Sequence, residues 1–273
     1  MRRIGIVSYT SDVHGLTIAQ QLEAHSDLSC HYFEIERLAT DTYLTWAAGS
    51  DMSATIEDRD GHRVIVSDLD LLWMRRYTPL GESSKAVSEV EPDLVRNEKS
   101  AALLGTLLTE FKGKWVNHPE ANRRATNKLV QLKCARECGL RLPQTLVTNC
   151  LEDVKRFAES TGTLIVKPIM GTRKKHLLTV EINVDELDEE AVRMCPAIYQ
   201  EKIEGSDHLR ACCFGDRVYV ARLTSDSLDW RANLDIPCEP FEVGSDLEDR
   251  LRTLLARLEL RMGVMDLKID LKG

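Results

Sequence analysis

The stretch "LIVKPIMGTRKKH" (residues 164–176) decides how the fold of this chain is interpreted. Its first residues are apolar and β-prone, which predicts a buried strand that delivers Lys167 at its end. A proline, a glycine and four basic side chains follow. Such a run is typical of a solvated surface loop, but backbone N–H groups and cations together also suit an anion. The rest of the chain favours the second interpretation.

The overall charge argues against a protein that binds nucleic acid. Charged residues make up 29% of the 273 residues, and the net charge is −8. General binding to a phosphate backbone calls for a basic field, which this balance does not supply. We therefore expect no nucleic-acid partner, and local basic patches matter more than the total.

The composition indicates a reduced cytoplasmic protein. No segment approaches the roughly 18 apolar residues that a membrane span needs, and the apolar run near the N-terminus is too short for a signal peptide. None of the eight cysteines forms a CxxC motif, and the histidines lack metal-ligand spacing. Cys134 and Cys138 share a helix face, where a metal pair stays open, although a pair of buried thiols is the better explanation.

Strand-like and helical runs alternate, which predicts an α/β fold. In the first region, residues 1–118, the patterns predict an open sheet with strands at residues 3–8, 30–35 and 70–74. Helical patterns cover residues 16–24 and 93–112, and Pro119 marks the boundary.

The second region, residues 119–196, reads as a small α/β unit. Its first helix carries apolar residues at helical spacing and ends at Gly139. Asn149, with Glu152 three residues later, predicts the cap of a second helix. The strand ending at Lys167 and the basic loop follow.

The third region, residues 197–273, begins with the strand "AIYQEKI". Gly215 and Asp216 predict a tight hairpin between two further strands. Ser245 and Glu248 predict the cap of a long helix that Gly263 stops, before a last strand over residues 264–270.

Charged residues fall at particular points of this pattern. Lys128 lies in the first turn of a helix, and Lys167 ends a strand some 40 residues later. Three arginines lie on the predicted hairpin and the loop after it, and Asp266 lies on the last strand; the arginines are Arg210, Arg222 and Arg231. Their order and spacing together are far more specific than any one of them.

With these residues identified, the chain resembles the ATP-grasp ligases, and among them the ribosomal-peptide maturases that make graspetides, the microviridin-type ligases. The resemblance covers essentially residues 1–273, and Tyr77 stands where the family usually has proline. It is carried by "LLWMRRYTP", "NHPEANRRATNKLVQLKCARECGLRLPQTLVTN", "LIVKP", "YQEKIEGSDHLR", "VYVARL", "DWR" and "GVMDLKID", in that order. It implies an N-terminal pre-ATP-grasp domain, a central lid domain and a C-terminal grasp domain.

The resemblance also implies a chemistry and its cofactors, ATP and Mg²⁺. ATP phosphorylates a carboxylate, and a hydroxyl or amine attacks the resulting acyl phosphate. Such a reaction depends on neutralised charge more than on a covalent nucleophile. Lys128 and Lys167 are expected to hold the α- and β-phosphates. The loop over residues 169–176, including Gly171, Thr172 and Arg173, is expected to close over the triphosphate and exclude water.

Other roles follow from the same resemblance. Glu201, Lys202 and Ile203 are expected to form the adenine hinge. His208 stands where related enzymes carry an acidic residue, so Asp207 or Glu204 is expected to contact the ribose instead.

The arginines and the aspartate complete the implied site. Arg210, Arg222 and Arg231 are expected to bind the γ-phosphate and the acyl phosphate, because guanidinium groups suit both anions. Asp266 is expected to bind magnesium, which prefers carboxylate oxygens.

The sequence departs from the family at its end. ATP-grasp enzymes follow that aspartate with a strand that carries a Glu-x-Asn pair, and the sequence ends at Gly273 before it. Either these residues are part of a longer chain, or the natural protein lacks the strand. From residues 1–273 alone we expect weak or no ligation, with the fold and partial nucleotide binding retained.

Three functions stay open at this stage. The first is a ligase that joins Asp or Glu side chains of a ribosomal precursor peptide, bound through leader and core, to Ser, Thr or Lys side chains as esters or amides. The second is a leader-peptide or nucleotide-binding pseudoenzyme. The third is a ligase that adds amino acids to a small acid or a protein tail. Whether the chain forms a homodimer is also open.

Overall fold

The protein is described from a computed structural model, in which residues 1–38, 41–49, 51–77, 92–171 and 177–270 are described. The chain divides into two compact units, Met1–Pro119 and Glu120–Gly273. The subdivision of the second unit near residue 197 remains a prediction.

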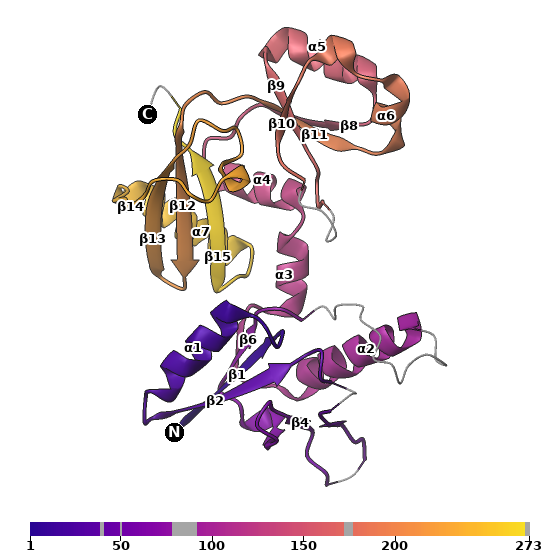
Figure 1. The fold of residues 1–273 in the computed structure, drawn as a ribbon, viewed down its shortest axis with the longest axis vertical. Coiled ribbons are helices and arrows are strands. Elements are labelled where there is room, and N and C mark those ends of the chain that lie inside the picture. Colours follow the sequence, from indigo (N-terminus) through magenta and orange to yellow (C-terminus); the bar gives the residue numbers. More distant parts are fainter. Residues whose placement is uncertain (39–40, 50, 78–91, 172–176, 271–273) are drawn as a thin grey trace. The chain divides into compact units, whose positions relative to one another are not determined.

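The first unit is built on a parallel sheet with the strand order β2-β1-β6-β7 (Figure 1). Its strands are β1 (Arg2–Ser8), β2 (Leu28–Glu34), β6 (Leu71–Met74) and β7 (Lys114–Val116). The predicted strands at residues 3–8, 30–35 and 70–74 are confirmed, each within two residues. The crossover helix α1 (Val13–Glu23) joins β1 to β2, and α2 (Pro92–Glu110) precedes β7.

Helices lie against both faces of this sheet because its side chains alternate between two apolar clusters. Ile6 packs with Ala19 of α1, while Val7 packs with Leu107 of α2. A three-stranded antiparallel sheet accompanies it, formed by β3 (Leu44–Thr45), β4 (Thr55–Glu57) and β5 (Arg63–Ile65).

The second unit contains two sheets and the helices that pack against them. The first sheet has the order β10-β9-β11-β8, with β8 (Thr145–Thr148), β9 (Leu164–Lys167), β10 (Val180–Ile182) and β11 (Ala197–Glu201). The second has the order β14-β13-β12-β15, with β12 (Asp207–Phe214), β13 (Arg217–Thr224), β14 (Cys238–Pro240) and β15 (Met262–Lys268). The helices are α3 (Pro119–Ala125), α4 (Lys128–Glu137), α5 (Leu151–Thr161), α6 (Glu189–Met194) and α7 (Ser245–Arg257).

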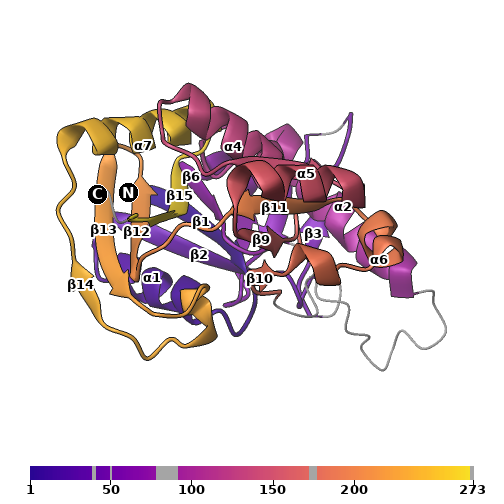
Figure 2. The same ribbon diagram turned by 90° about the horizontal axis from the view of Figure 1, so that it is seen from above.

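Each of these sheets has one face covered by a helix. Val154 of α5 packs against Leu164 of the first sheet. Leu251 and Leu255 of α7 pack against Ala211 and Cys213 of β12, and Figure 2 shows α7 along that face. Because strand side chains alternate, the even-numbered residues of β12 lie on the opposite face, away from α7.

Two predicted turns are confirmed. Gly139 follows the end of α4 with a φ of 77°, a conformation that glycine adopts without steric cost. Gly215, with a φ of 60°, and Asp216 connect β12 to β13 as the predicted two-residue hairpin turn.

Three predicted helix signals are wrong. Asn149 does not cap α5: its Nδ2 donates to the carbonyl of Arg193, and Cys150 is the residue before the helix. Ser245 is the first residue of α7 rather than its cap, since Gly244 precedes it, and Glu248 pairs with Arg252 instead.

Gly263 does not stop α7, because it lies inside β15. The chain turns at Glu259, whose φ is 59°. Gly263 is needed for packing instead, since an added Cβ would lie 3.0 Å from Cδ1 of Leu255.

Among the described residues, no helix has both the length and the apolar character needed to cross a membrane. Cys134 and Cys138 are partly buried beside the apolar cluster around Leu254, which agrees with their interpretation as core thiols.

Candidate functional site

The first lysine of the candidate site begins a helix. Lys128 is the first residue of α4, and the side chain of Asn127 caps that helix by accepting a 2.9 Å hydrogen bond from the N–H of Leu129. The ammonium group of Lys128 donates to the carbonyl of Pro168, the residue that directly follows β9. The helix start and the strand end are therefore in contact at this point.

The second lysine is held by a buried amide. Nζ of Lys167 donates a 2.7 Å hydrogen bond to Oε1 of Gln200, whose side chain is only 4% exposed. Nε2 of Gln200 in turn donates to Oγ1 of Thr145 at 2.7 Å. Lys167 and Gln200 lie on the face of their sheet that α5 does not cover, because Leu164 and Tyr199 point to α5.

These lysines influence one another electrostatically. Burial, together with the positive charges of Lys128 and Arg231, lowers the pKa of Lys167 to about 8. Burial also lowers the pKa of Lys128, again with a contribution from Arg231. Three cations from separate elements thus share one region that a polyanion would stabilise.

A buried carboxylate holds the third cation. Asp229 is 7% exposed, and its two oxygens accept from Nε and a terminal nitrogen of Arg231 at 2.7 and 2.5 Å. It also accepts from the N–H of Thr179 at 3.1 Å. Burial acts to raise the pKa of Asp229, but the hydrogen bonds from Arg231 and Thr179 prevail and lower it to about 2. Asp229 is therefore ionised, and it orients Arg231.

The open face of the second sheet contributes Arg210 and Asp266. Their side chains form a 2.8 Å ion pair between adjacent strands β12 and β15, and the Arg210 guanidinium lies 5.2 Å from the ring centre of Trp230. The pKa of Arg231 is raised, by its hydrogen bond to Asp229 and also by the charge of Asp266. Arg231 therefore links the two lysines to Asp266.

His208 lies on the same face of β12 as Arg210. Its imidazole is 7% exposed, and its Nε2 is buried with no hydrogen-bond partner among the described residues. Burial lowers the pKa of His208, and the neighbouring Lys268 acts in the same direction. The imidazole is therefore neutral at pH 7 and has an unused polar atom.

The predicted adenine hinge begins at the last residue of β11. The N–H of Glu201 donates to the carbonyl of Gln144 at 2.9 Å, and the N–H of Lys202 donates to that of Thr163 at 3.0 Å. The side chain of Lys202 pairs with Glu181 and Glu204 at 2.9 and 3.1 Å, so it is engaged at the surface. Ile203 follows.

The other predicted residues are Asp207, Gly171, Thr172 and Arg173. Oδ1 of Asp207 accepts a 3.1 Å hydrogen bond from the hydroxyl of Thr224, so its two carboxylate oxygens are not both available to a ribose. Thr172 and Arg173 lie outside the described residues. Gly171 has a φ of 78°, a conformation that side chains other than glycine rarely adopt.

Arg222 is not brought to this site. In the register of the hairpin it is paired with Leu209, so it shares a face with Val220, which packs toward α7. Its guanidinium pairs with Glu239 and lies 5.8 Å from the ring centre of Phe241. Arg210 and Arg231 are both influenced by Asp266, whereas Arg222 lies on the other side of the sheet.

The site residues predicted from the sequence do not include Gln200, Asp229 or His208. The signal for Gln200 was available, since alternation along "YQEKI" places it on the face of Lys167. His208 was noticed only as a departure from a family pattern.

Metal-ligating groups are sparse in this region. Among the described residues, the only group of three or more ligating side chains within reach of one ion is Asp58, Asp60 and His62 in the first unit. At Asp266 the described chain offers a single carboxylate, 45% exposed and paired with Arg210, so phosphate oxygens and water would have to supply the other ligands to a magnesium ion.

No family model matches the chain. A solved structure of a Chryseobacterium gregarium RiPP-associated ATP-grasp ligase, in complex with ADP and a leader and core peptide, superimposes over all of this chain and 86% of its own, with a TM-score of 0.88 and 23% identity.

The chain has the ATP-grasp fold.

Other comparisons agree with this ATP-grasp assignment. The ligase PsnB, in complex with a minimal precursor, Mg and ADP, matches 99% of this chain and 85% of its own, with a TM-score of 0.81 and 24% identity. A curated relative, the alpha-aminoadipate–LysW ligase LysX of Sulfurisphaera tokodaii, is 23% identical over 182 residues, 62% of this chain. The alignment spans 64% of the length of that relative.

Proposed function

We propose that the protein is an ATP-dependent carboxylate ligase that acts on a ribosomally made precursor peptide. Asp or Glu side chains would be activated as acyl phosphates and joined to Ser, Thr or Lys side chains as esters or amides. The observation that carries the proposal is the shared electrostatic environment of Lys128, Lys167 and Arg231. The fold supports it, since both solved relatives described above are ATP-grasp ligases with ADP and precursor peptide.

Each residue has a stated part in this proposal. Lys128 and Lys167 bind the phosphates of ATP as point charges, while Gln200 orients the Lys167 ammonium. Arg231, fixed by Asp229, and Arg210 neutralise the charge that develops on the acyl phosphate. Gly171 gives the loop after β9 the backbone freedom to approach the phosphates.

The base and the ribose would bind beyond the phosphates. Since the N–H of Glu201 is engaged with Gln144, the carbonyl of Glu201 and the N–H of Ile203 are proposed to contact adenine. His208 replaces Asp207 as the proposed ribose contact, because its buried Nε2 lacks a partner and a sugar hydroxyl would provide one.

Magnesium supplies Lewis-acid charge neutralisation between the phosphates when it is bound. Asp266 is the carboxylate proposed to hold it, and Arg210, which now pairs with Asp266, would then be released toward the reacting carboxylate.

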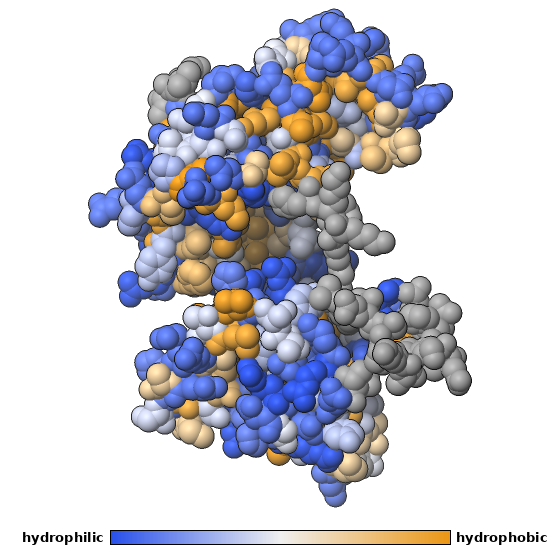
Figure 3. Space-filling view, viewed as in Figure 1, coloured by the Kyte–Doolittle hydropathy of each residue, from blue (hydrophilic) through white to orange (hydrophobic). Residues whose placement is uncertain are grey.

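The precursor peptide would also contact the region around β9 and β10. Figure 3 shows that apolar residues reach the surface over this part of the chain. Large apolar side chains exposed here include Met170, Leu177, Leu178 and Val180. Exposed apolar side chains gathered in one segment suit the apolar face of a leader peptide.

The test has two parts. AMPPNP affinity is measured by calorimetry for the wild type, Lys167→Met and the control Lys155→Met, which alters an exposed lysine of α5. We expect at least about a tenfold loss for Lys167→Met only, because a charge-assisted contact is removed. Incubation with ATP, Mg²⁺ and a genome-neighbouring precursor should then remove one water from the peptide for each bond formed, as read by mass spectrometry. Equal nucleotide affinity in all three proteins would contradict the assigned phosphate site.

A second function is favoured by the curated relative, which by its name joins alpha-aminoadipate to LysW. In that case a free amino acid would raise ATP turnover, and a precursor peptide would not. The same ATP assay, run with each substrate class, separates the two functions.

A further inference from the structure

We propose that the first unit carries a binding site for a side-chain carboxylate of an acidic peptide, formed by Arg75 and Arg76 at the ends of β1 and β6. The assignment rests on the proposed function, since it names the group of the substrate that this unit would hold. All of its residues belong to the first unit.

The strand order creates the site. From β1 the chain crosses through α1 to β2 on one side, whereas β6 pairs with β1 on the other side. The order therefore reverses between β1 and β6. In open parallel sheets, ligands bind beyond the carboxyl ends of the strands at such a reversal.

Two arginines are fixed at this position by the backbone. The N–H groups of Arg75 and Arg76 both donate to the carbonyl of Val7, each at 3.0 Å. They directly follow β6, so both residues lie at the carboxyl end of β1 as well.

One of these arginines is already compensated. Nε of Arg75 lies 3.2 Å from a carboxylate oxygen of Asp12, and its guanidinium lies 5.9 Å from the ring centre of Trp73. Asp12 is almost buried and also accepts from Ser8. Burial acts to raise the pKa of Asp12, but the Ser8 hydrogen bond and the charge of Arg75 lower it, so Asp12 stays ionised.

The guanidinium of Arg76 is available to bind an anion. Its side chain is exposed, and within the described part of the chain it makes no hydrogen bond or ion pair. Asp12, Arg75 and Arg76 together leave one positive charge, which matches a monoanionic carboxylate better than a multiply charged phosphate. A guanidinium also binds a carboxylate through two parallel hydrogen bonds.

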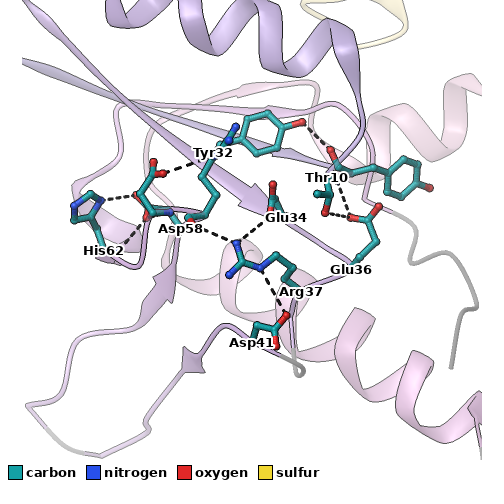
Figure 4. Close-up of polar contacts among 11 residues, drawn as sticks. Thr10, Tyr32, Glu34, Glu36, Arg37, Asp41, Asp58 and His62 are labelled. Carbon is teal, nitrogen blue, oxygen red and sulfur yellow. Dashed lines mark hydrogen bonds and ion pairs between the residues drawn. The ribbon is translucent and has the colours of Figure 1, made fainter. Parts of the chain in front are cut away.

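The carboxylates at the neighbouring end of β2 do not cancel this charge, because other groups hold them (Figure 4). Glu34 is 6% exposed and accepts from Arg37 at 3.1 Å, and Glu36 accepts from the N–H of Thr10 at 3.0 Å. The same view shows Tyr32 beside these residues, where its hydroxyl donates to the carbonyl of Tyr9 at 2.9 Å. Glu34 is therefore paired with Arg37 and Glu36 is held by a backbone N–H, and neither forms an ion pair with Arg76 in the described part of the chain.

The test compares two fluorescein-labelled peptides, one of alternating Thr and Glu and one with Gln in place of each Glu. Their anisotropy is measured on the full chain without nucleotide. Arg76→Gln is the test variant, because removing the half-buried Arg75 would leave Asp12 unpaired. Arg2→Gln is the matched control, since Arg2 is exposed at the opposite end of β1 and the change in charge is the same.

We expect Arg76→Gln to weaken binding of the Glu peptide about fivefold, as for one exposed ion pair, and to leave the Gln peptide and AMPPNP affinity unchanged. Arg2→Gln should alter neither peptide. Equal losses in both variants, or displacement of the Glu peptide by inorganic phosphate, would overturn the proposal. The AMPPNP measurement keeps the two proposals apart: a protein that binds no nucleotide would defeat the proposed function, while the peptide comparison still decides the carboxylate site.

Discussion

Lys167 is held by Gln200: its Nζ donates a 2.7 Å hydrogen bond to Oε1 of an amide that is 4% exposed. Lys167 is therefore oriented before any anion binds. The amide of Gln200 is itself fixed by its hydrogen bond to Thr145. An ammonium on a flexible stem otherwise loses conformational freedom when it binds phosphate. Because the Gln200 amide already restricts the Lys167 side chain, less conformational freedom is lost when phosphate binds.

Replacing Gln200 with leucine should therefore weaken both stability and nucleotide binding. Gln200→Leu leaves Lys167 and Thr145 without their buried partner, at a cost of about 1–3 kcal/mol in the free energy of unfolding. Urea denaturation measures this cost. Gln144→Leu, on an exposed residue, should stay within about 0.5 kcal/mol of the wild type. If both variants unfold at the same urea concentration, the amide has no orienting role.

The depressed pKa of Lys167 predicts a stability that rises at alkaline pH. Its folded pKa of about 8 lies below its usual value, so between these pH values the unfolded chain binds the proton more tightly than the folded chain does. Stability should then increase from about pH 8 to about pH 10.5, by up to about 3 kcal/mol, and be unaffected by this group below that window. Lys167→Met removes the effect, so the two unfolding curves should diverge with pH. Parallel curves would show that Lys167 has an ordinary pKa.

Asp229 gives a dependence of the same sign at acidic pH, since its pKa is also lowered in the folded protein. Its folded pKa of about 2 lies below the usual value, so the stabilisation is present above about pH 4 and is lost as the pH falls toward 2. The loss should amount to about 2 kcal/mol. Asp229→Asn lacks this dependence and frees Arg231, so its unfolding free energy should change less between pH 4 and 2 than that of the wild type. Ser160→Ala, at an exposed residue of α5, serves as the control and should follow the wild type.

Two glycines of the first unit should respond in opposite ways to alanine. An added Cβ at Gly113 would lie 2.4 Å from the carbonyl oxygen of Asp70 and 2.6 Å from that of Leu69, so Gly113→Ala must displace backbone. We expect a loss of about 2 kcal/mol or more. Gly105 is exposed within α2 and has open space, so Gly105→Ala should stabilise by about 1 kcal/mol. Thermal unfolding monitored by circular dichroism compares the two. A neutral Gly113→Ala would contradict the close approach.

Arg210 and Arg222 lie on opposite faces of the sheet that contains β12 and β13, so their substitution should affect ligation activity differently. Arg210→Gln should reduce ligation by about a hundredfold, since it removes charge stabilisation at the proposed reaction site. Arg222→Gln should lower activity less than about threefold, because it lies on the face toward α7 and pairs with Glu239. Steady-state ADP release with a precursor peptide measures both. Equal losses of activity in the two variants would show that Arg222 also belongs to the reaction site.

The fold could be predicted from the sequence because its strands and helices have clear periods. Alternation at residues 3–8 and 70–74 and the helical spacing after Lys128 gave element types that the structure confirms. Helix ends were predicted less well. Gly263 appeared as a stop signal because glycine breaks helices, whereas the structure places it in a strand where a side chain would meet Leu255. A sequence pattern does not contain that packing constraint.

The candidate site was predicted only in part for a similar reason. Lys128 and Arg231 act electrostatically on Lys167, and Asp266 acts on Arg231, so the proposed site of the four residues stays a prediction. The sequence alone could not show that Arg210 and Arg222 lie on opposite faces, because the hairpin register decides which face each side chain occupies. Gln200 has no charge to attract notice, and its role depends on a contact 33 positions away in the sequence.

The alternation along β12 has a consequence for how this protein can diversify. Ala211 and Cys213 maintain the packing with α7, while His208 and Arg210 point the other way. Selection for folding and selection for specificity therefore act on interleaved positions of a single strand, and neither constrains the other directly. A combinatorial library confined to the even positions would sample new substrates while leaving the hydrophobic interior intact.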